Sequence, residues 1–75
     1  MPNITCLAPN IRAYRKQKKL TQKGLANALW VSYQTISAWE RGQSIPDLMN
    51  TIQLADFFGI SLDQLLSPLE VTTNL

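Results

Sequence analysis

The chain has 75 residues, with seven basic and five acidic side chains, no histidine and one cysteine. This length holds one small domain, and a single cysteine without histidine excludes an intrachain disulfide and argues against a zinc site. The composition also lacks a histidine base and a glycine-rich phosphate loop, which argues against catalysis. We therefore expect no enzymatic activity, no cofactor, no metal ion and no small-molecule ligand.

Charge is divided unevenly along the chain. Residues 1–41 hold all seven cations and one acid, Glu40, and carry +6, whereas residues 42–75 hold four acids and carry −4. Such asymmetry favours a polyanionic partner, with a merely solvated helix end as the alternative. No stretch approaches the roughly 20 apolar residues of a membrane span. Residues 1–7 lack a secretory signal, so we expect a cytoplasmic protein without membrane contact.

The first predicted helix begins near the N-terminus. Apolar residues recur there at helical spacing, at Leu7, Ile11 and Tyr14. This helix should end within residues 16–19, where cations suit the negative end of a helix dipole.

Hydroxyl side chains mark the starts of the next two helices. Thr21 is expected to cap a helix over residues 22–29, and Ser32 to cap a helix over residues 33–41. Gly42 should end the latter, since glycine adopts the left-handed conformation that commonly follows a helix.

Two further helices complete the predicted fold. A fourth should begin at Pro46, and Ser61 should cap a fifth that ends before Pro68. The core-facing residues expected on the fourth helix are Leu48, Ile52, Ala55 and Phe58. The sequence therefore predicts an all-α, compact five-helix bundle over residues 1–67, with residues 68–75 as a tail, linker or dimer contact.

The predicted second and third helices are joined by a three-residue turn at residues 30–32. Such a unit can place its second helix in the major groove of DNA. Five residues of that helix share an arc of about 140°, and Ile36 and Trp39 face the opposite side. The five are Tyr33, Gln34, Ser37, Ala38 and Arg41. Glutamine can read adenine, arginine guanine, serine either base, and alanine the thymine methyl group, so this arc is predicted to read base edges. A solvated polar face is the alternative.

The segment LTQKGLANAL at residues 20–29, followed by VSYQTISAWERG at residues 31–42, resembles the lambda-repressor-like helix-turn-helix of phage repressors and small bacterial regulators. Segments between residues 45 and 66 are similar to that family's fourth and fifth helices. The resemblance implies a sequence-specific, double-stranded DNA-binding transcriptional regulator, most often a repressor. Because one helix reads only a few base pairs, we expect a homodimer on a pseudo-palindromic operator.

The resemblance also implies contacts with the DNA backbone. It assigns one to Gln22, at a helix start where free amides attract phosphate, and implies that Gln34 either braces Gln22 or reads the DNA beside it. Backbone amides of the turn Gly42-Gln43-Ser44 are expected to hold a second phosphate. Three lysines should add attraction that is independent of sequence, or else face only solvent. They are Lys18, Lys19 and Lys23.

Two further expectations follow from the family pattern. In the family, the glutamate that matches Glu40 pairs with an arginine of the first helix, and Arg15 occupies that position here. We predict a structural ion pair that neutralises Glu40 and fixes the first helix against the third. Trp30 stands where the family has glycine, which predicts either backbone strain or a differently shaped turn, with an indole that covers the core edge or a partner. Thr51 stands where a core leucine is common.

Two other functions remain open at this point. One is a protein-interaction module, an antitoxin or anti-regulator that binds its partner through the acidic second half. The other is the DNA-binding fragment of a longer repressor. An apolar cluster could also form a surface for dimerisation, comprising Met49, Phe57, Leu69, Val71 and Leu75.

Overall fold

A computed structural model describes residues 3–69, which form five α-helices and one short 3₁₀ turn. The turn η1 spans Ile4–Cys6, and the helices are α1 (Leu7–Gln17), α2 (Gln22–Leu29), α3 (Tyr33–Glu40), α4 (Leu48–Phe58) and α5 (Leu62–Leu65). The predicted all-α, five-helix fold is confirmed. Within the described residues, no helix is both long enough and apolar enough to cross a membrane.

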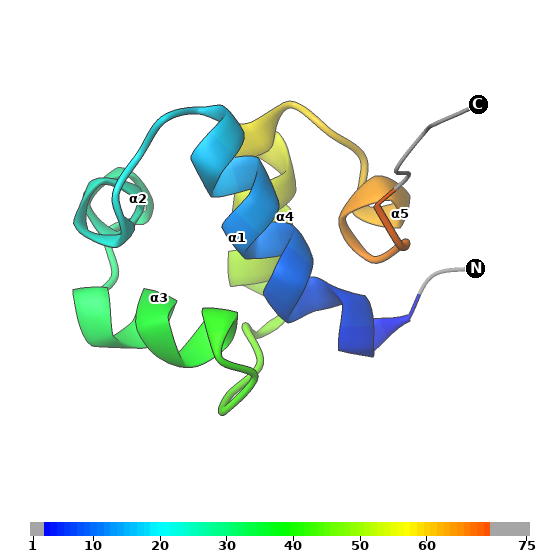
Figure 1. Ribbon diagram of the computed structural model, residues 1–75, viewed down its shortest axis with the longest axis horizontal. Helices are drawn as coiled ribbons and strands as arrows, with labels where there is room; N and C mark the ends of the chain where they lie inside the picture. The colour runs from blue at the N-terminus through cyan, green and yellow to red at the C-terminus, as the bar shows by residue number, and fades with distance from the viewer. Residues whose placement is uncertain (1–2, 70–75) are drawn as a thin grey trace.

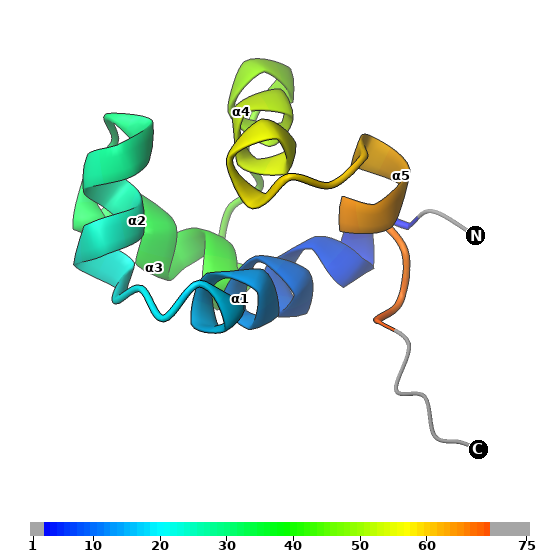
Figure 2. The ribbon, with the colours of Figure 1, turned by 90° about the horizontal axis from the view of Figure 1, so that it is seen from above.

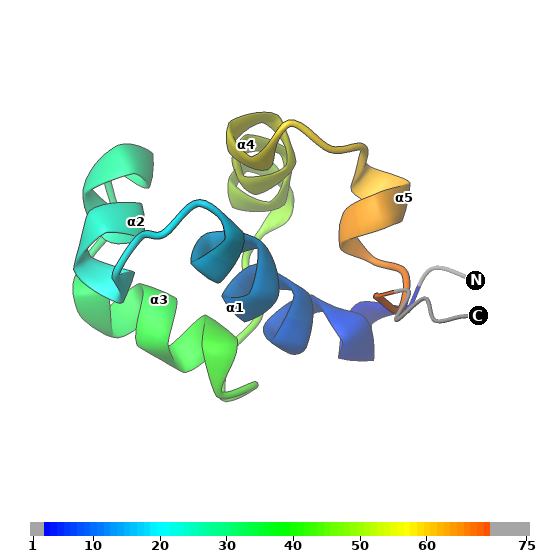
Figure 3. The same ribbon diagram turned by 45° about the horizontal axis from the view of Figure 1, so that its top comes forward.

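The helices enclose one core. In Figure 1, α1 lies in front of α4, with α2 and α3 at one end of the domain and α5 at the other. From above, α1 and α4 lie on opposite sides of the domain (Figure 2), and α5 lies beside the beginning of α1 (Figure 3). All five helices contribute buried apolar side chains to the space between them: Leu7, Ile11, Leu25, Ala26, Leu29, Ile36, Trp39, Leu54, Ala55 and Leu65.

Local capping sets the helix boundaries. Side-chain oxygens of Thr21, Ser32, Asp47 and Ser61 accept hydrogen bonds from amides in the first turns of α2 to α5, at 2.8 to 3.1 Å. Ser61 also donates its own amide to the Gln64 side chain at 2.9 Å, which completes a capping box. Each cap stabilises its helix by about 1 kcal/mol, so these starts are encoded by nearby residues.

The buried side of α4 differs from the prediction. Leu48 is 70% exposed and Ile52 is only half-buried, whereas Thr51, Leu54 and Ala55 are buried. The expectation that Leu48 and Ile52 face the core was therefore wrong, and those for Ala55, which is buried, and Phe58, which packs against the core, were right. Thr51 can be buried because its hydroxyl donates a hydrogen bond to the carbonyl oxygen of Asp47, at 2.7 Å, and so leaves no unsatisfied polar group.

A buried asparagine of α1 holds the end of α5 and the residues that follow it. The Asn10 side chain is 1% exposed, and its Nδ2 donates to the carbonyl oxygens of Leu65 at 2.7 Å and Ser67 at 2.6 Å. The first carbonyl belongs to the last residue of α5 and the second lies two residues after it, where backbone acceptors lack helical partners. Asn10 thus fixes α5 on α1, and sequence periodicity gave no sign of this role.

The apolar cluster suggested for dimerisation is only partly exposed. Met49 is 64% exposed and Leu69 is 37% exposed. Phe57 instead packs against the core, with its ring centroid 5.8 Å from that of Phe58. The remaining members of the predicted cluster, Val71 and Leu75, lie outside the described residues.

Trp30 ends α2 in the left-handed backbone conformation, with φ +60° and ψ +38°. The turn therefore keeps the backbone conformation that glycine would adopt. Of the two expectations, backbone strain and a differently shaped turn, the first is correct. The indole is 94% exposed, so it does not cover the edge of the core. A left-handed conformation costs a residue with a Cβ atom about 1–2 kcal/mol.

We expect Trp30→Gly to raise the free energy of unfolding by about 0.5–1 kcal/mol, because relief of strain exceeds the added entropy of an unfolded glycine. Urea denaturation followed by circular dichroism measures this change. Trp30→Ala is the control, since it removes the indole but keeps the Cβ atom, and it should stay close to the wild type. Equal stabilisation by both substitutions would show that the exposed indole, and not the left-handed backbone, lowers the stability of the wild type.

Candidate nucleic-acid interface

The turn between α2 and α3 holds these helices in a fixed relation. The Val31 amide donates to the Ala26 carbonyl oxygen at 3.0 Å, which closes the end of α2, and Ser32 then caps α3. On the buried side, Ile36 is fully buried and Trp39 is 4% exposed. The opposite side of α3 lies at the surface of the domain, and the Gln22 side chain at the start of α2 reaches the last residue of α3.

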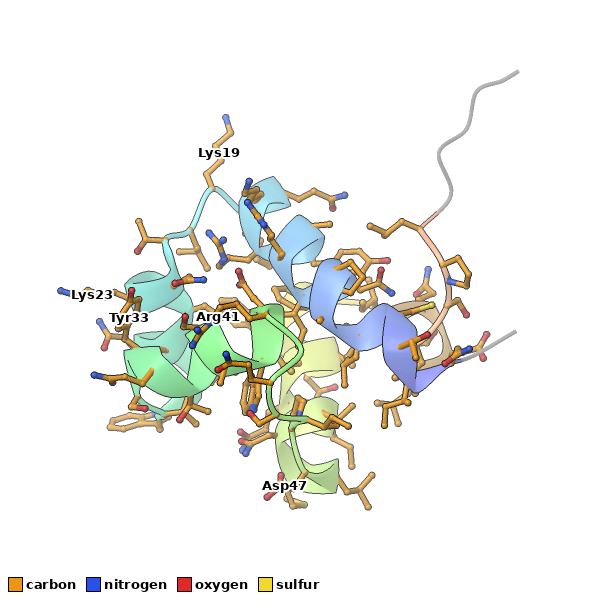
Figure 4. All side chains as sticks on the ribbon, turned by 60° about the horizontal axis from the view of Figure 1, so that its bottom comes forward. Lys19, Lys23, Tyr33, Arg41 and Asp47 are labelled. Carbon is orange, nitrogen blue, oxygen red and sulfur yellow. The ribbon has the colours of Figure 1, made fainter. Side chains whose placement is uncertain are left out.

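The predicted base-reading residues lie on this outer side to different degrees. Tyr33, Gln34 and Arg41 are exposed, and Ser37 and Ala38 are half-buried. The Arg41 Nε donates to the Ser37 carbonyl oxygen at 3.2 Å, so this guanidinium lies back along its own helix. In Figure 4, Tyr33 and Arg41 lie on the same side of the view as Lys23 of α2. The surface thus combines aromatic, amide, hydroxyl and guanidinium groups.

Arg15 and Glu40 form a two-point ion pair. The Arg15 Nε donates to Glu40 Oε2 at 2.6 Å, and its Nη2 donates to Oε1 at 3.0 Å. The two side chains are 11% and 3% exposed, respectively. The remaining Nη1 donates to the Leu20 carbonyl oxygen at 2.7 Å. One guanidinium therefore connects α1, the α1–α2 turn and the last residue of α3.

Gln22 also contacts this pair. Its Nε2 donates to Glu40 Oε1 at 3.0 Å, a contact that the sequence did not indicate. Glu40 thus accepts three hydrogen bonds, which compensate for the burial of its charge. At the start of α2, the backbone amides of Gln22 and Lys23 have no acceptor within residues 3–69. These two amides are available to an anion near the surface.

The turn after α3 differs from the prediction. Gly42 adopts φ +73°, as expected of the residue that ends the helix. However, the amides of Gly42, Gln43 and Ser44 donate to carbonyl oxygens of Trp39 and Ala38, at 2.9 to 3.4 Å. The expectation that these amides are free for a phosphate was wrong, because they satisfy the unpaired carbonyls at the end of α3. The exposed side chains of Gln43 and Ser44 remain available.

The three predicted lysines occupy different surroundings. The Lys18 Nζ lies 5.3 Å from the centroid of the Phe57 ring, on the side of α4. Lys19 projects from the α1–α2 turn, away from the other labelled residues (Figure 4). Lys23, in the first turn of α2, lies near Tyr33 in the same view. Of the three, Lys23 is the one that belongs to α2, the helix that packs on α3.

Comparisons with known proteins agree with this geometry. A helix-turn-helix family model matches residues 11–65. The chain is 38% identical to the HTH-type transcriptional activator BcrR of Enterococcus faecalis over 63 residues, which cover 84% of this chain and 31% of BcrR. It is 39% identical to the uncharacterized HTH-type transcriptional regulator YqaE of Bacillus subtilis over 57 residues, 76% of this chain and 49% of YqaE. The chain thus spans less than half the length of either relative.

The fold is also similar to that of the P22 c2 repressor in complex with a synthetic operator. The TM-score is 0.76 and the identity 36%, with 81% of this chain and 92% of that chain covered. The chain therefore belongs to the lambda-repressor-like helix-turn-helix family, and the family inferred from the sequence is confirmed.

Proposed function

We propose that this domain binds double-stranded DNA sequence-specifically and regulates transcription, with α3 inserted into the major groove. The observation that carries the proposal is the exposed polar side of α3, together with two amides at the start of α2 that have no acceptor within residues 3–69. The Arg15–Glu40 pair supports it, because it removes the one negative charge of residues 1–41 from the surface. The similarity to an operator-bound repressor supports the same mode of binding.

Base recognition follows from the chemistry of the α3 side chains. Gln34 can form two hydrogen bonds with adenine, and Arg41 can do so with guanine once it leaves the Ser37 carbonyl oxygen. Ser37 can donate or accept a hydrogen bond, and the Ala38 methyl group suits the methyl group of thymine. Tyr33, at the start of the helix, would contact a base edge or the sugar-phosphate backbone.

Contacts with phosphate would hold α3 in register. Gln22 would donate its backbone amide, because its side-chain amide already donates to Glu40. Lys23 would supply charge beside it. Further contacts would come from the Gln43 and Ser44 side chains, and Lys18 and Lys19 would add longer-range attraction.

We further propose that two copies bind a pseudo-palindromic operator in the cytoplasm, and that binding represses transcription. Two helices spaced by about one turn of DNA would read enough base pairs for a specific site, which one α3 cannot do. The similarity to the P22 c2 repressor favours repression. Two chains per bound duplex, measured by analytical ultracentrifugation, would support the dimer, and one chain on a fully occupied site would contradict it.

We expect Lys23→Ala to weaken binding to all duplexes alike and to lower the slope of log affinity against log salt by about one unit. The reason is that a phosphate contact releases one counterion whatever the bases are. Titrations with a preferred and a random duplex between 50 and 200 mM salt measure both effects. A loss confined to one sequence would instead assign Lys23 to base recognition.

The proposed function itself is tested by fluorescence anisotropy with labelled duplex DNA at two salt concentrations. We expect micromolar or tighter binding that weakens steeply as salt increases, as is typical when several phosphates are neutralised. Unlabelled duplex of the same sequence should compete better than unlabelled duplex of random sequence. No binding at low salt would reject the proposal and favour a protein-interaction module.

A further inference from the structure

A second basic surface lies on α1, outside the predicted interface. It consists of Arg12 and Lys16, which are both exposed. They are one helical turn apart, so their Cβ atoms lie about 6 Å from each other on the same side of the helix. Neither side chain has a hydrogen-bond or ion-pair partner within residues 3–69.

These two cations line an open groove on the surface. Its walls are formed by Pro9, Arg12, Ala13, Lys16 and Glu40, so the groove joins the outer side of α1 to the end of α3. Glu40 does not cancel the positive charge, because its carboxylate is 3% exposed and paired with Arg15. The groove is therefore electropositive, and α1 itself contains no acidic residue.

The groove continues the proposed DNA-binding surface. Helix α1 packs directly on α3, and the Arg15–Glu40 contacts at 2.6 and 3.0 Å hold the two helices together next to the groove. Figure 4 shows α1 beside α3 in the view that presents Lys23, Tyr33 and Arg41. A duplex against α3 would bring phosphates past the end of this helix and towards α1.

The helix dipole does not account for this pair of cations. Lys16 is in the last turn of α1, where a cation is favourable, but Arg12 is a full turn earlier. Arg15 is already used by Glu40, so it adds no free charge. Two cations without a partner in residues 3–69 remain on the same side of the helix, and a chain of phosphates is a ligand that suits both.

We infer that Arg12 and Lys16 bind the phosphodiester backbone of duplex DNA and extend the interface from α3 onto α1. This inference rests on the proposed function. The contact is independent of base sequence, so it raises affinity for every duplex and enlarges the salt dependence of binding. It does not alter which bases α3 prefers.

The test uses the full chain, a labelled random-sequence duplex and a salt titration. Arg12→Gln and Lys16→Gln should each lower the slope of log affinity against log salt by about 0.9, and the double variant by about 1.8. Gln53→Glu is the matched control, because it makes the same change in net charge at an exposed position on α4. It should leave the slope near the wild-type value, and so should Arg12→Lys, which keeps the charge.

The outcomes separate the two proposals. If the wild type binds with strong salt dependence and the Arg12 and Lys16 variants keep its slope, the inference is wrong and the proposed function stands. If Gln53→Glu lowers the slope as much as they do, net charge alone is responsible, and the inference is again wrong. If the wild type does not bind the duplex at low salt, both the proposed function and the inference about Arg12 and Lys16 are wrong.

Discussion

Replacing Arg15 with methionine is expected to lower the free energy of unfolding by about 3–5 kcal/mol. The substitution leaves the Glu40 carboxylate, 3% exposed, without the cation that balances its charge and donates two hydrogen bonds to it, and the Leu20 carbonyl oxygen without its donor. A domain of this size has a total stability on the order of 5–10 kcal/mol, so the loss is a large part of it. Urea denaturation followed by circular dichroism measures the difference.

A double variant separates loss of the pair from loss of packing. Arg15→Met combined with Glu40→Leu removes both charges, and we expect it to be more stable than Arg15→Met alone, because no buried charge is left unpaired. Glu40→Gln removes the charge of this side chain but keeps its shape, and so also tests whether the Arg15–Glu40 ion pair is structural. If Glu40→Gln alters base preference but not thermal stability, the pair acts in recognition and the structural role is wrong.

Replacing Gln34 with alanine should weaken binding to the preferred duplex by about 1–3 kcal/mol, or roughly 5- to 150-fold. The side chain is exposed on α3 and has no hydrogen-bond partner within residues 3–69, so the unbound domain loses little by the change. Binding to random-sequence DNA should stay nearly constant, since phosphate contacts are retained. Titrations with the preferred and the random-sequence duplex at one salt concentration give the ratio of the two affinities.

The control for this prediction is Gln53→Ala, the same substitution at an exposed position of α4. It should change neither affinity nor base preference. Ser37→Ala, like Gln34→Ala, is expected to relax base preference, because it removes a hydroxyl from the same side of α3. An equal loss on both duplexes for Gln34→Ala would mean that this residue contacts the backbone and not the bases.

The starts of α2, α3 and α5 could be predicted from the sequence because their causes are local, whereas α4 begins at Leu48 and not at the predicted Pro46, because Asp47 caps it. The side-chain oxygens of Thr21, Ser32 and Ser61 each accept a hydrogen bond from the backbone amide three residues later, in the first turn of the helix that follows. At Trp30 the family pattern left open either backbone strain or a differently shaped turn, and only the structure shows the strained, left-handed conformation. The pairing of Arg15 with Glu40 spans 25 residues and was anticipated only from the family resemblance.

Features that depend on distant partners could not be predicted. Periodicity on α4 does not distinguish a register that buries Leu48 from one that buries Thr51, because it does not reveal that the Thr51 hydroxyl can be satisfied by the Asp47 carbonyl oxygen. Asn10 reaches carbonyls 55 and 57 residues later, which no local pattern indicates. The amides after Gly42 looked free in sequence but close the end of α3.

Helix α3 is proposed to read the base sequence of duplex DNA. Selection of bound duplexes from a random-sequence pool, with wild-type protein and with Gln34→Ala, tests it most directly. We predict that the wild type enriches a two-fold symmetric sequence with half-sites about one helical turn apart. We also predict that Gln34→Ala loses the preference at one position in each half-site. No enriched sequence with the wild type, or the same sequence with both proteins, would contradict the claim.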